Sequence, residues 1–319
     1  MIVTVTLNAA IDRTLTVPNF QRGQRHRASA GVTVAGGKGI NVARALKTLG
    51  IPVVATGLVG GTTGTRIVEE LTNEAILNDF VHIDGESRTS TAVVDSTGGT
   101  YTEINEWGPA VRAEELETLL EKLRYLTQGA ELVVFAGSLP RDVAHDFYAE
   151  ATRELTRRHI HVALDTEGEP LLLGVEAEPF LVTPNQAEAE ALVGQEFHDD
   201  EDFRIALDSV AEMGARNVVI TTEQGCVALL REEKGEPMRY RALAPKVEPV
   251  STVGSGDVLL AAFIAARHAG RPQEESLRAA VAAGAASTLE IGAGQFDPRQ
   301  AGRLQAGVEL SELQPVETI

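Results

Sequence analysis

The stretch STVGSGDVLLAAFI, residues 251–264, places a short glycine-rich turn directly before an apolar helix. Gly254 and Gly256 allow backbone conformations that gather several N–H groups on one spot, and the helix N-terminus adds its dipole there. This arrangement predicts an anion hole. Asp257 is electrostatically out of place in it, unless it acts as a base beside negative charge that develops on a phosphate in transfer. An acidic residue in the first turn of an ordinary helix explains the same letters without any chemistry.

A second glycine-rich stretch, AGGKGINVA at 35–43, also opens a helix, because apolar residues recur at helical spacing from Ile40 to Leu49. It is not a P-loop, since Gly37 stands where that motif needs lysine. It is not a dinucleotide fingerprint, since Val42 stands where the third glycine belongs. One helix start therefore carries a lysine and the other an aspartate. A kinase needs two such anion sites, one for the phosphorylated donor and one for the acceptor.

Five segments, in this order along the chain, resemble the PfkB (ribokinase-like) sugar kinases: TLNAAID at 6–12, GGKGINVARALKTLG at 36–50, VVFAGSLP at 133–140, PNQAEAE at 184–190 and STVGSGD at 251–257. The resemblance covers essentially the whole chain. It is strongest to the hexose-phosphate branch of the family, which includes the 1-phosphofructokinases and the tagatose-6-phosphate kinases.

The resemblance implies a kinase that uses ATP and Mg²⁺ to phosphorylate a primary hydroxyl of a hexose phosphate. Fructose 1-phosphate is the leading acceptor, and tagatose 6-phosphate and fructose 6-phosphate are close alternatives. Two other interpretations stay open. A ribokinase or nucleoside kinase would have no need of the cations Lys38 and Arg88, and a catalytically silent sugar-phosphate-binding regulator would have no need of Asp257.

Composition limits the partners of the chain. Its 319 residues carry a net charge of −18, which repels nucleic acid and anionic membranes and makes each cation near a phosphate site informative. The single Cys226 excludes an intramolecular disulfide and favours a reducing, cytoplasmic compartment. We find no basic and apolar leader and no apolar run long enough for a membrane span, so we expect a cytoplasmic protein.

Apolar strands alternate with helical segments along most of the chain, which predicts a three-layer α/β/α core with a mostly parallel sheet covered on both faces. We expect one domain over 1–319. The expected strands lie near 2–7, 53–56, 132–135, 162–164, 180–182 and 218–220, and the expected helices near 65–74, 114–125, 143–158, 257–268 and 274–289.

Two stretches break the alternation, at about 13–34 and 88–106. Each has β-branched, alternating segments without a helix, and the turn Ser96–Gly99 predicts a hairpin in the second. We interpret both as a small β-sheet lid. Apolar lid residues such as Val93 and Ile104 would be a liability on a monomer. The resemblance implies that the lid serves as a clasp in a homodimer.

Acceptor-site candidates lie in the first half of the chain. Asp12, placed at the end of the first strand, and Asn41, in the first turn of the glycine-rich helix, would bind sugar hydroxyls. Gly37 and Lys38 would bring backbone N–H groups and a charge to the acceptor's phosphate, and Arg88 would bind it bidentately. Further candidates are Arg27 in the lid and Ser138 after a buried strand. A turn aspartate, a surface lysine and a turn serine are the plain alternatives.

Donor-site candidates lie in the second half. Asn185 and Glu188 resemble the family's Asn-x-x-Glu signature, which implies a magnesium role for Glu188; a helix cap explains the same spacing. The other nucleotide-binding candidates are Thr222, Gly225, Gly254, Gly256 and Ser287. Asp257 is the expected base, with Gly254, Ser255 and Gly256 supplying N–H groups to the transferring phosphoryl group.

Overall fold

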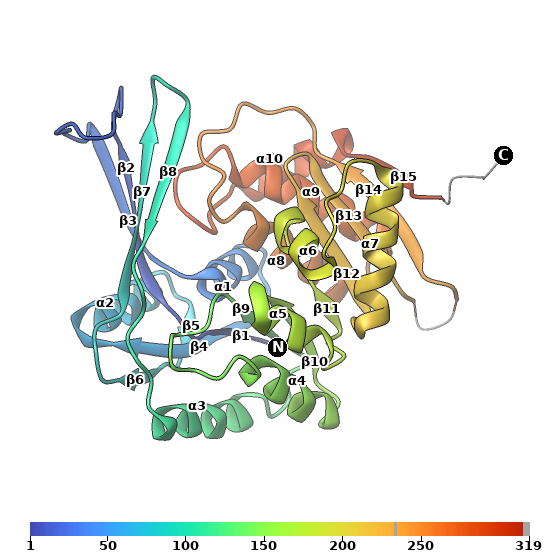
Figure 1. Cartoon of the computed structure of the whole chain (residues 1–319), viewed down its shortest axis with the longest axis horizontal. Helices are drawn as coiled ribbons and strands as arrows, with labels where there is room; N and C mark the ends of the chain where they lie inside the picture. Colours follow the sequence, from blue (N-terminus) through green and yellow to red (C-terminus); the bar gives the residue numbers. More distant parts are fainter. Residues whose placement is uncertain (233–234, 315–319) are drawn as a thin grey trace.

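A mixed sheet forms the centre of the protein. A computed structural model describes residues 1–232 and 235–314, so 233–234 and the last five residues of the expected domain lie outside it. Neighbouring strands follow the order β15-β14-β13-β12-β11-β10-β9-β1-β4-β5, and β6 pairs with β4 (Figure 1). The bounds are β1 Ile2–Thr6, β4 Val53–Gly60, β5 Leu77–Asn78, β6 Val81–Ile83, β9 Leu132–Ala136, β10 His161–Asp165, β11 Leu181–Val182, β12 Asn217–Thr222, β13 Gly225–Leu230, β14 Met238–Leu243 and β15 Glu309–Glu312.

The strands from β12 to β5, with β6, run parallel, as the alternating pattern predicts. Beyond β12 the sheet continues as the antiparallel strands β13, β14 and β15. The mostly parallel sheet is therefore confirmed, and the antiparallel edge is an addition that the sequence pattern did not indicate.

Helices cover both faces of this sheet, and each face has its own hydrophobic core. One core takes residues from α1 (Lys38–Thr48), α2 (Gly61–Asn73), α8 (Ser255–His268), α9 (Gln273–Ser287) and α10 (Pro298–Leu304), with the short turn η1 (Gln305–Gly307) after it. The other takes residues from α3 (Ala113–Leu126), α4 (Phe147–Arg157), α5 (Gly168–Val175), α6 (Gln186–Val193) and α7 (Asp200–Met213).

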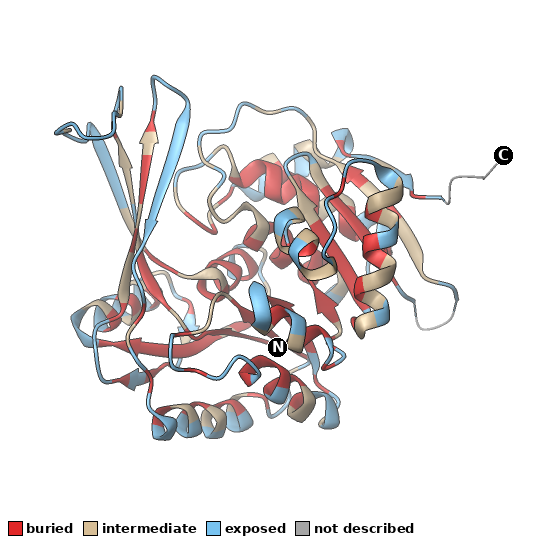
Figure 2. Ribbon diagram, in the orientation of Figure 1, coloured by how far each residue is buried: buried red, intermediate tan, exposed pale blue. Residues whose placement is uncertain are grey.

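Successive residues of the central strands belong to opposite cores. In β9, Val133 and Phe135 pack in one core while Val134 and Ala136 pack in the other. This alternation follows from the strand period of two, and burial on both faces explains the continuous apolar runs in the sequence. Figure 2 shows these strands as buried. The expected three-layer arrangement is confirmed.

Helix α4 begins later than expected, at Phe147 instead of about residue 143. Two successive turns precede it, in which Val143 N donates to Pro140 O at 3.2 Å and Phe147 N donates to Ala144 O at 3.0 Å. The apolar spacing therefore continues through turns that are not helical.

A second sheet forms the expected lid and rises from one end of the core (Figure 1). Its order is β3-β2-β7-β8, with β2 Ala10–Thr16, β3 Ala30–Gly36, β7 Arg88–Asp95 and β8 Thr100–Asn105. β7 and β8 make the expected hairpin. One expectation was wrong: Asp12 does not end the first strand, because β1 ends at Thr6 and Asp12 lies within the lid strand β2.

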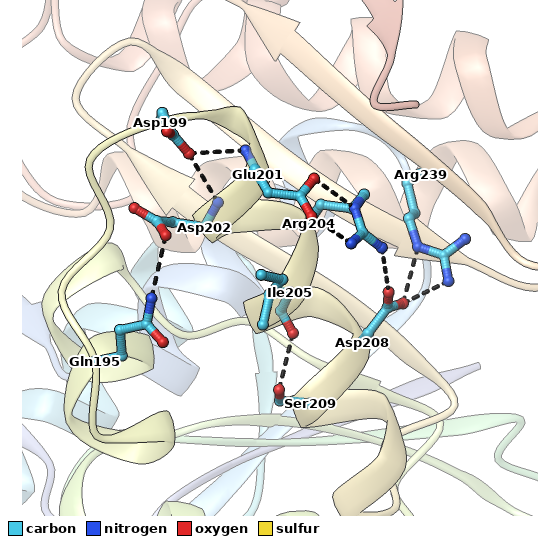
Figure 3. A network of polar contacts seen from close by, with 9 residues as sticks. All are labelled: Gln195, Asp199, Glu201, Asp202, Arg204, Ile205, Asp208, Ser209 and Arg239. Atoms are coloured by element: carbon cyan, nitrogen blue, oxygen red, sulfur yellow. Dashed lines mark hydrogen bonds and ion pairs between the residues drawn. The ribbon is translucent and has the colours of Figure 1, made fainter. Parts of the chain in front are cut away.

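Polar contacts fix α7 against the antiparallel edge of the sheet (Figure 3). Asp199 caps the helix by accepting hydrogen bonds from the backbone N–H groups of Glu201 and Asp202, each at 3.0 Å. Asp208 pairs with Arg204 of the same helix at 3.1 Å and accepts from Arg239 of β14 at 2.8 Å. None of these residues lines the cavities described below, so this network is structural.

Candidate active site

The glycine-rich turn before α8 has the shape that the sequence predicts, although its two glycines act differently. Gly254 is the N-cap residue and is left-handed, with φ 77° and ψ 7°. A Cβ on it would lie 2.9 Å from Gly294 N, so glycine is required there. Gly256 is an ordinary helical residue, and the expectation that it also needs special backbone freedom was wrong. A Cβ at Gly256 would meet nothing within 4 Å, because that side faces open space.

The second glycine-rich turn starts α1 and lies beside the first. Its N-cap, Gly37, has φ 108°, and a Cβ there would lie 2.7 Å from a methyl group of Thr6. One turn into the helix, Asn41 Nδ2 donates a 2.8 Å hydrogen bond to Asp257 Oδ2. The two helix starts, more than 200 residues apart in sequence, therefore face one space.

That space is a cavity of about 740 Å³. The lid, the two glycine-rich turns and the carboxyl ends of the parallel strands all contribute to its wall. Predicted site residues that line it are Asp12, Gly37, Lys38, Asn41, Arg88, Ser138, Asn185, Glu188, Gly254, Ser255, Gly256 and Asp257.

A smaller cavity of about 130 Å³ adjoins the first, and Thr221, Ser255 and Gly256 line both. Its wall includes the predicted Thr222 and Gly225 together with small residues of α9, among them Gly284 and Ala285.

Two predicted residues line neither cavity. Ser287 is buried, and its hydroxyl donates to Gly284 O at 2.7 Å, so its neighbours Ala285 and Thr288 line the smaller cavity instead. Arg27 is exposed, in the segment that precedes β3.

Asp257 is deeply buried for an acid of the main cavity, with an exposed fraction of 5 %, the same as that of Asp165. Burial, together with the nearby Asp165 carboxylate, raises its pKa from 3.8 to about 7, while Lys38 and the hydrogen bond from Asn41 oppose the rise. A carboxylate whose pKa lies close to neutral pH is well matched to the work of a general base.

Lys38 extends toward two carboxylates. Its Nζ lies 2.8 Å from Asp165 Oδ1 and 3.6 Å from Glu188 Oε1. Burial works against the charge, but Asp165, Glu188 and Asp257 raise the pKa of Lys38 above its usual value. Glu188 also closes a capping box with Asn185, in which each side chain accepts from the other's backbone N–H, at 2.8 and 2.9 Å. Lys38 therefore sits among the acids near Asp257, and Glu188 serves as a cap and as a cavity carboxylate together.

Arg88 lies at the base of the lid next to Asp12. The paired strands β2 and β7 bring the two side chains together, and burial raises the pKa of Asp12 to about 6 while the Arg88 charge opposes the rise. Arg88 Nε donates to Asn8 O at 3.2 Å, and Asn8 Nδ2 donates to Ser138 Oγ at 3.2 Å. This end of the cavity offers a carboxylate, a guanidinium and a hydroxyl, which suits the hydroxyls and phosphate of a sugar.

The family model for pfkB family carbohydrate kinases matches residues 2–300. The chain belongs to the PfkB family of carbohydrate kinases. It is therefore a phosphotransferase that acts on a sugar hydroxyl. Among its curated relatives, the 1-phosphofructokinase of Borreliella burgdorferi is 34% identical over 91% of this chain and 92% of that protein. The 1-phosphofructokinase of Bacillus subtilis is 34% identical over 93% of this chain and 96% of that protein.

Solved structures agree with the family. Phosphofructokinase-2 from Escherichia coli, in complex with substrates and products, superposes with a TM-score of 0.88 at 29% identity, over 96% of this kinase and 98% of that chain. Another solved form of that enzyme, an inhibited one, is tetrameric. Ribokinase from Arabidopsis thaliana superposes with a TM-score of 0.73 at 21% identity, over 95% and 98% of the chains, which shows the ribokinase-like fold.

The kinase's main cavity is lined mainly by acidic rather than by basic side chains. Among the described residues, its lining has more carboxylates than cations: Asp12, Glu103, Glu106, Asp165, Glu167, Glu188 and Asp257 against Lys38, Arg88 and Arg141. Of these, Glu103, Glu106, Asp165, Glu167 and Arg141 were not predicted. Only Asp165 carried a usable signal, since it directly follows the apolar run Val162–Leu164, at the carboxyl end of a parallel strand.

Arg44 is a further residue that the sequence did not single out, and it is buried in the kinase core behind the site. Its guanidinium donates to Glu74 Oε1 at 2.9 Å, to Ala35 O at 2.8 Å and to Ala293 O at 3.1 Å. It also donates to Asn41 Oδ1 at 3.3 Å, and so helps to orient the amide that holds Asp257.

No helix in residues 1–232 and 235–314 has both the length and the apolar character of a membrane span.

Proposed function

We propose that this kinase is a 1-phosphofructokinase, which uses ATP to convert fructose 1-phosphate to fructose 1,6-bisphosphate. The observation that carries the proposal is a buried base, Asp257, in one cavity with the cation Arg88. The base can take a proton from a sugar hydroxyl, and the cation can bind the phosphate of an acceptor that is already phosphorylated. Four curated relatives that are 31–34% identical to this chain carry the name 1-phosphofructokinase, which supports this acceptor.

In the proposed reaction, Asp257 takes the proton of the acceptor's primary hydroxyl as its oxygen attacks the γ-phosphorus of ATP. The bond from that phosphorus to the bridging oxygen breaks, and ADP leaves. The backbone N–H groups at the start of α8 stabilise the charge on the γ-phosphoryl oxygens. Asp12 and Asn41 bind sugar hydroxyls, and Gly37 N–H, Arg88 and Ser138 hold the acceptor.

The donor nucleotide fits the remaining space. The smaller cavity opens beside Gly256, and its small residues, Gly284 and Ala285, leave room for a flat base. Thr222 and Gly225 flank the turn from β12 to β13 and line the smaller cavity, so they would contact the ribose or phosphates. With its phosphates at the start of α8, the nucleotide would extend from the smaller cavity into the larger one.

The residues also fit a magnesium ion that arrives with the nucleotide. Within the described residues, no group of three or more His, Cys, Asp or Glu side chains forms a ready metal site. Magnesium commonly uses one or two carboxylates together with waters and substrate phosphates. Glu188 and Asp165, which both face Lys38, would supply those carboxylates. When bound, the ion would neutralise charge on the phosphate oxygens.

The main competing acceptors are fructose 6-phosphate and tagatose 6-phosphate. The same solved enzyme that superposes on this chain, phosphofructokinase-2, has also been solved in complex with fructose 6-phosphate, at 28% identity to this chain. A coupled ADP-release assay across ketose phosphates and free sugars tests the assignment. The highest kcat/KM with fructose 1-phosphate supports the proposal, and a clear preference for either 6-phosphate contradicts it.

Glu188→Gln should weaken use of MgATP and raise the magnesium concentration needed for half-maximal rate, with little change in the KM of the acceptor. Glutamine keeps an oxygen that can accept the Asn185 N–H, so the cap survives while the charge is lost. Steady-state kinetics at several magnesium concentrations, with thermal melting as control, make the measurement. A lower melting temperature with unchanged kinetics would mean that Glu188 is only a cap.

We propose that the lid forms a homodimer contact. Strand β8 is exposed along its whole length at the edge of the lid sheet (Figure 2). Ile104 on this strand is 60 % exposed. The expectation that Val93 adds to this apolar surface was wrong, since Val93, on the lid strand β7, is buried. An exposed edge strand that carries apolar side chains, as β8 does at Tyr101 and Ile104, favours pairing with a second chain.

Light scattering at micromolar concentration should therefore give twice the 34.0 kDa of the chain. Ile104→Glu should shift the mass toward the monomer, because it places charge on the edge strand. Ile205→Glu, at an exposed apolar residue of α7 outside the lid, is the matched control and should leave the mass unchanged. A wild-type mass of 34.0 kDa would contradict the proposal.

A further inference from the structure

A tryptophan and an arginine meet at the main cavity. Trp107 follows lid strand β8 and is 76 % exposed, and Arg141 lies in the loop after β9. The guanidinium carbon of Arg141 is 5.7 Å from the centre of the indole ring, a cation–π distance. Both residues line the cavity. The contact therefore joins the segment that follows the lid strand β8 to the core at the wall of this cavity.

Asn8 places this pair at the same end of the cavity as Arg88. Arg88 donates to the Asn8 carbonyl, and the Asn8 amide donates to Ser138, three residues before Arg141. Gly108, next to Trp107, lies so close to Asn8 that a Cβ there would be 2.1 Å from Asn8 Oδ1. Both segments thus surround the residue that also holds Arg88.

The lack of a carboxylate partner distinguishes Arg141, among the described residues, from the other two cations of the cavity. Lys38 is paired with Asp165, and Arg88 is influenced by the carboxylates of Asp12 and Glu103. In the part of the chain that the structure describes, Arg141 has no carboxylate partner and donates no hydrogen bond, and its side chain rests on the indole face. An unpaired guanidinium in an acidic cavity of a chain at −18 is the group best able to accept a further anion.

We propose that Arg141, held by Trp107, is a second phosphate-binding residue of the acceptor site, which acts with Arg88 on the phosphate of the sugar substrate. This inference rests on the proposed function, because it needs an acceptor that already carries a phosphate. Two guanidinium groups can together meet the charge of a phosphate dianion, which one partly neutralised arginine does poorly. Trp107 pre-orients the arginine through the cation–π contact.

The test uses the intact protein without nucleotide. Trp107 is the single tryptophan of the chain, so its fluorescence reports this location alone. Titration of wild type with fructose 1-phosphate should change the emission saturably, and free fructose should leave it nearly unchanged. Calorimetry should show that Arg141→Ala raises the Kd of fructose 1-phosphate about 10-fold or more, the effect of one lost charge-assisted contact. The Kd of ATP should stay within about twofold in the same variant.

Two variants sharpen the result. Trp107→Leu should weaken fructose 1-phosphate binding in the same direction but less, because it removes only the support of the arginine. Arg124→Ala removes an equal charge from a surface ion pair between α3 and α4 and should change neither Kd. Arg141 is exposed, so its substitution should not disturb folding, and far-ultraviolet circular dichroism checks this.

The outcomes separate this inference from the function it rests on. If Arg141→Ala binds fructose 1-phosphate as tightly as wild type while Arg88→Ala does not, the role of Arg141 is overturned and the acceptor assignment stands. If Arg141→Ala weakens ATP instead, Arg141 belongs to the donor, and the proposal is again overturned. If wild type binds no ketose phosphate but phosphorylates a free sugar, both the inference and the proposed function fail.

Discussion

Asp257→Asn is expected to lower kcat by about 10²- to 10⁴-fold, the usual contribution of a general base. Asparagine has almost the same shape, and its carbonyl oxygen can still accept the hydrogen bond from Asn41. What is lost is the ability to take a proton at neutral pH. Binding of ATP and of the acceptor should therefore remain near wild type, and the effect should lie in kcat. A variant that keeps more than about a tenth of wild-type turnover would contradict proton abstraction by Asp257.

Asp199→Asn provides the matched control for this substitution. Asp199 is also an acid at a helix start, but it caps α7 in the network of Figure 3, outside both cavities. Asparagine is a good N-cap residue, so stability should change little. Turnover should stay within about twofold of wild type. The contrast between the two variants separates loss of an acid at any helix start from loss of the base.

The pH profile of kcat/KM gives a second measurement of the same role. Burial raises the pKa of Asp257 to about 7, so the carboxylate is protonated and inactive below that pH and active above it. The rate should fall as the pH drops through about 7. Asp165→Asn removes a negative charge that raises this pKa, so the acid limb should move to lower pH. The acceptor's own phosphate, whose second pKa is about 6, gives a separate limb in every variant.

Local pattern was sufficient for most of the fold. Strands buried on both faces require continuous apolar runs, and helices that cover one face require apolar residues at helical spacing, so both are legible without tertiary information. The antiparallel edge of the sheet and the exact start of α4 could not be predicted from the local sequence pattern. Strand direction depends on which neighbour a strand finds, and the turns before Phe147 keep the apolar spacing of a helix.

Residues that line the main cavity could be predicted where a chemically distinctive side chain lies in a glycine-rich helix start, as at Gly254, Asp257 and the α1 turn with Lys38. Prediction was less successful where function depends on contacts between distant segments. Lys38 was expected beside the acceptor's phosphate with Arg88, but its partner Asp165 is 127 residues away in sequence. No local pattern reveals that pairing. The sequence likewise gives no indication of a role for Arg141, because that role depends on a contact with Trp107, which belongs to a distant segment of the chain.

The second large effect concerns the charge of the acceptor. Arg88→Ala should lower kcat/KM for fructose 1-phosphate by about 10- to 100-fold, since a charge-assisted contact contributes about 1.5–3 kcal/mol. The loss should appear in the acceptor's KM and hardly in that of MgATP. Free fructose, which lacks the phosphate, should lose little. The preference for phosphorylated over free ketose should therefore narrow. Arg153→Ala, which removes a surface cation paired with Glu150, is the control and should change neither substrate.

Lys38→Ala should behave differently from Arg88→Ala, and that difference tests the arrangement of the site. Because Lys38 is paired with Asp165 and lies near Glu188, its removal leaves the acids around Asp257 without their cation. We expect a comparable loss of about 10- to 100-fold, but spread over both substrates and visible in kcat. Steady-state kinetics with fructose 1-phosphate, fructose 6-phosphate, tagatose 6-phosphate and fructose, at varied ATP, distinguish the two patterns. If the Lys38 variant is impaired only in its use of the acceptor, Lys38 binds the acceptor's phosphate together with Arg88, as the sequence predicted. A wild-type enzyme that favours free fructose would overturn the assignment of a hexose phosphate as the acceptor. The assignment as a sugar kinase would stand, because the proposed roles of Asp257 and the two helix starts do not depend on a phosphate on the acceptor.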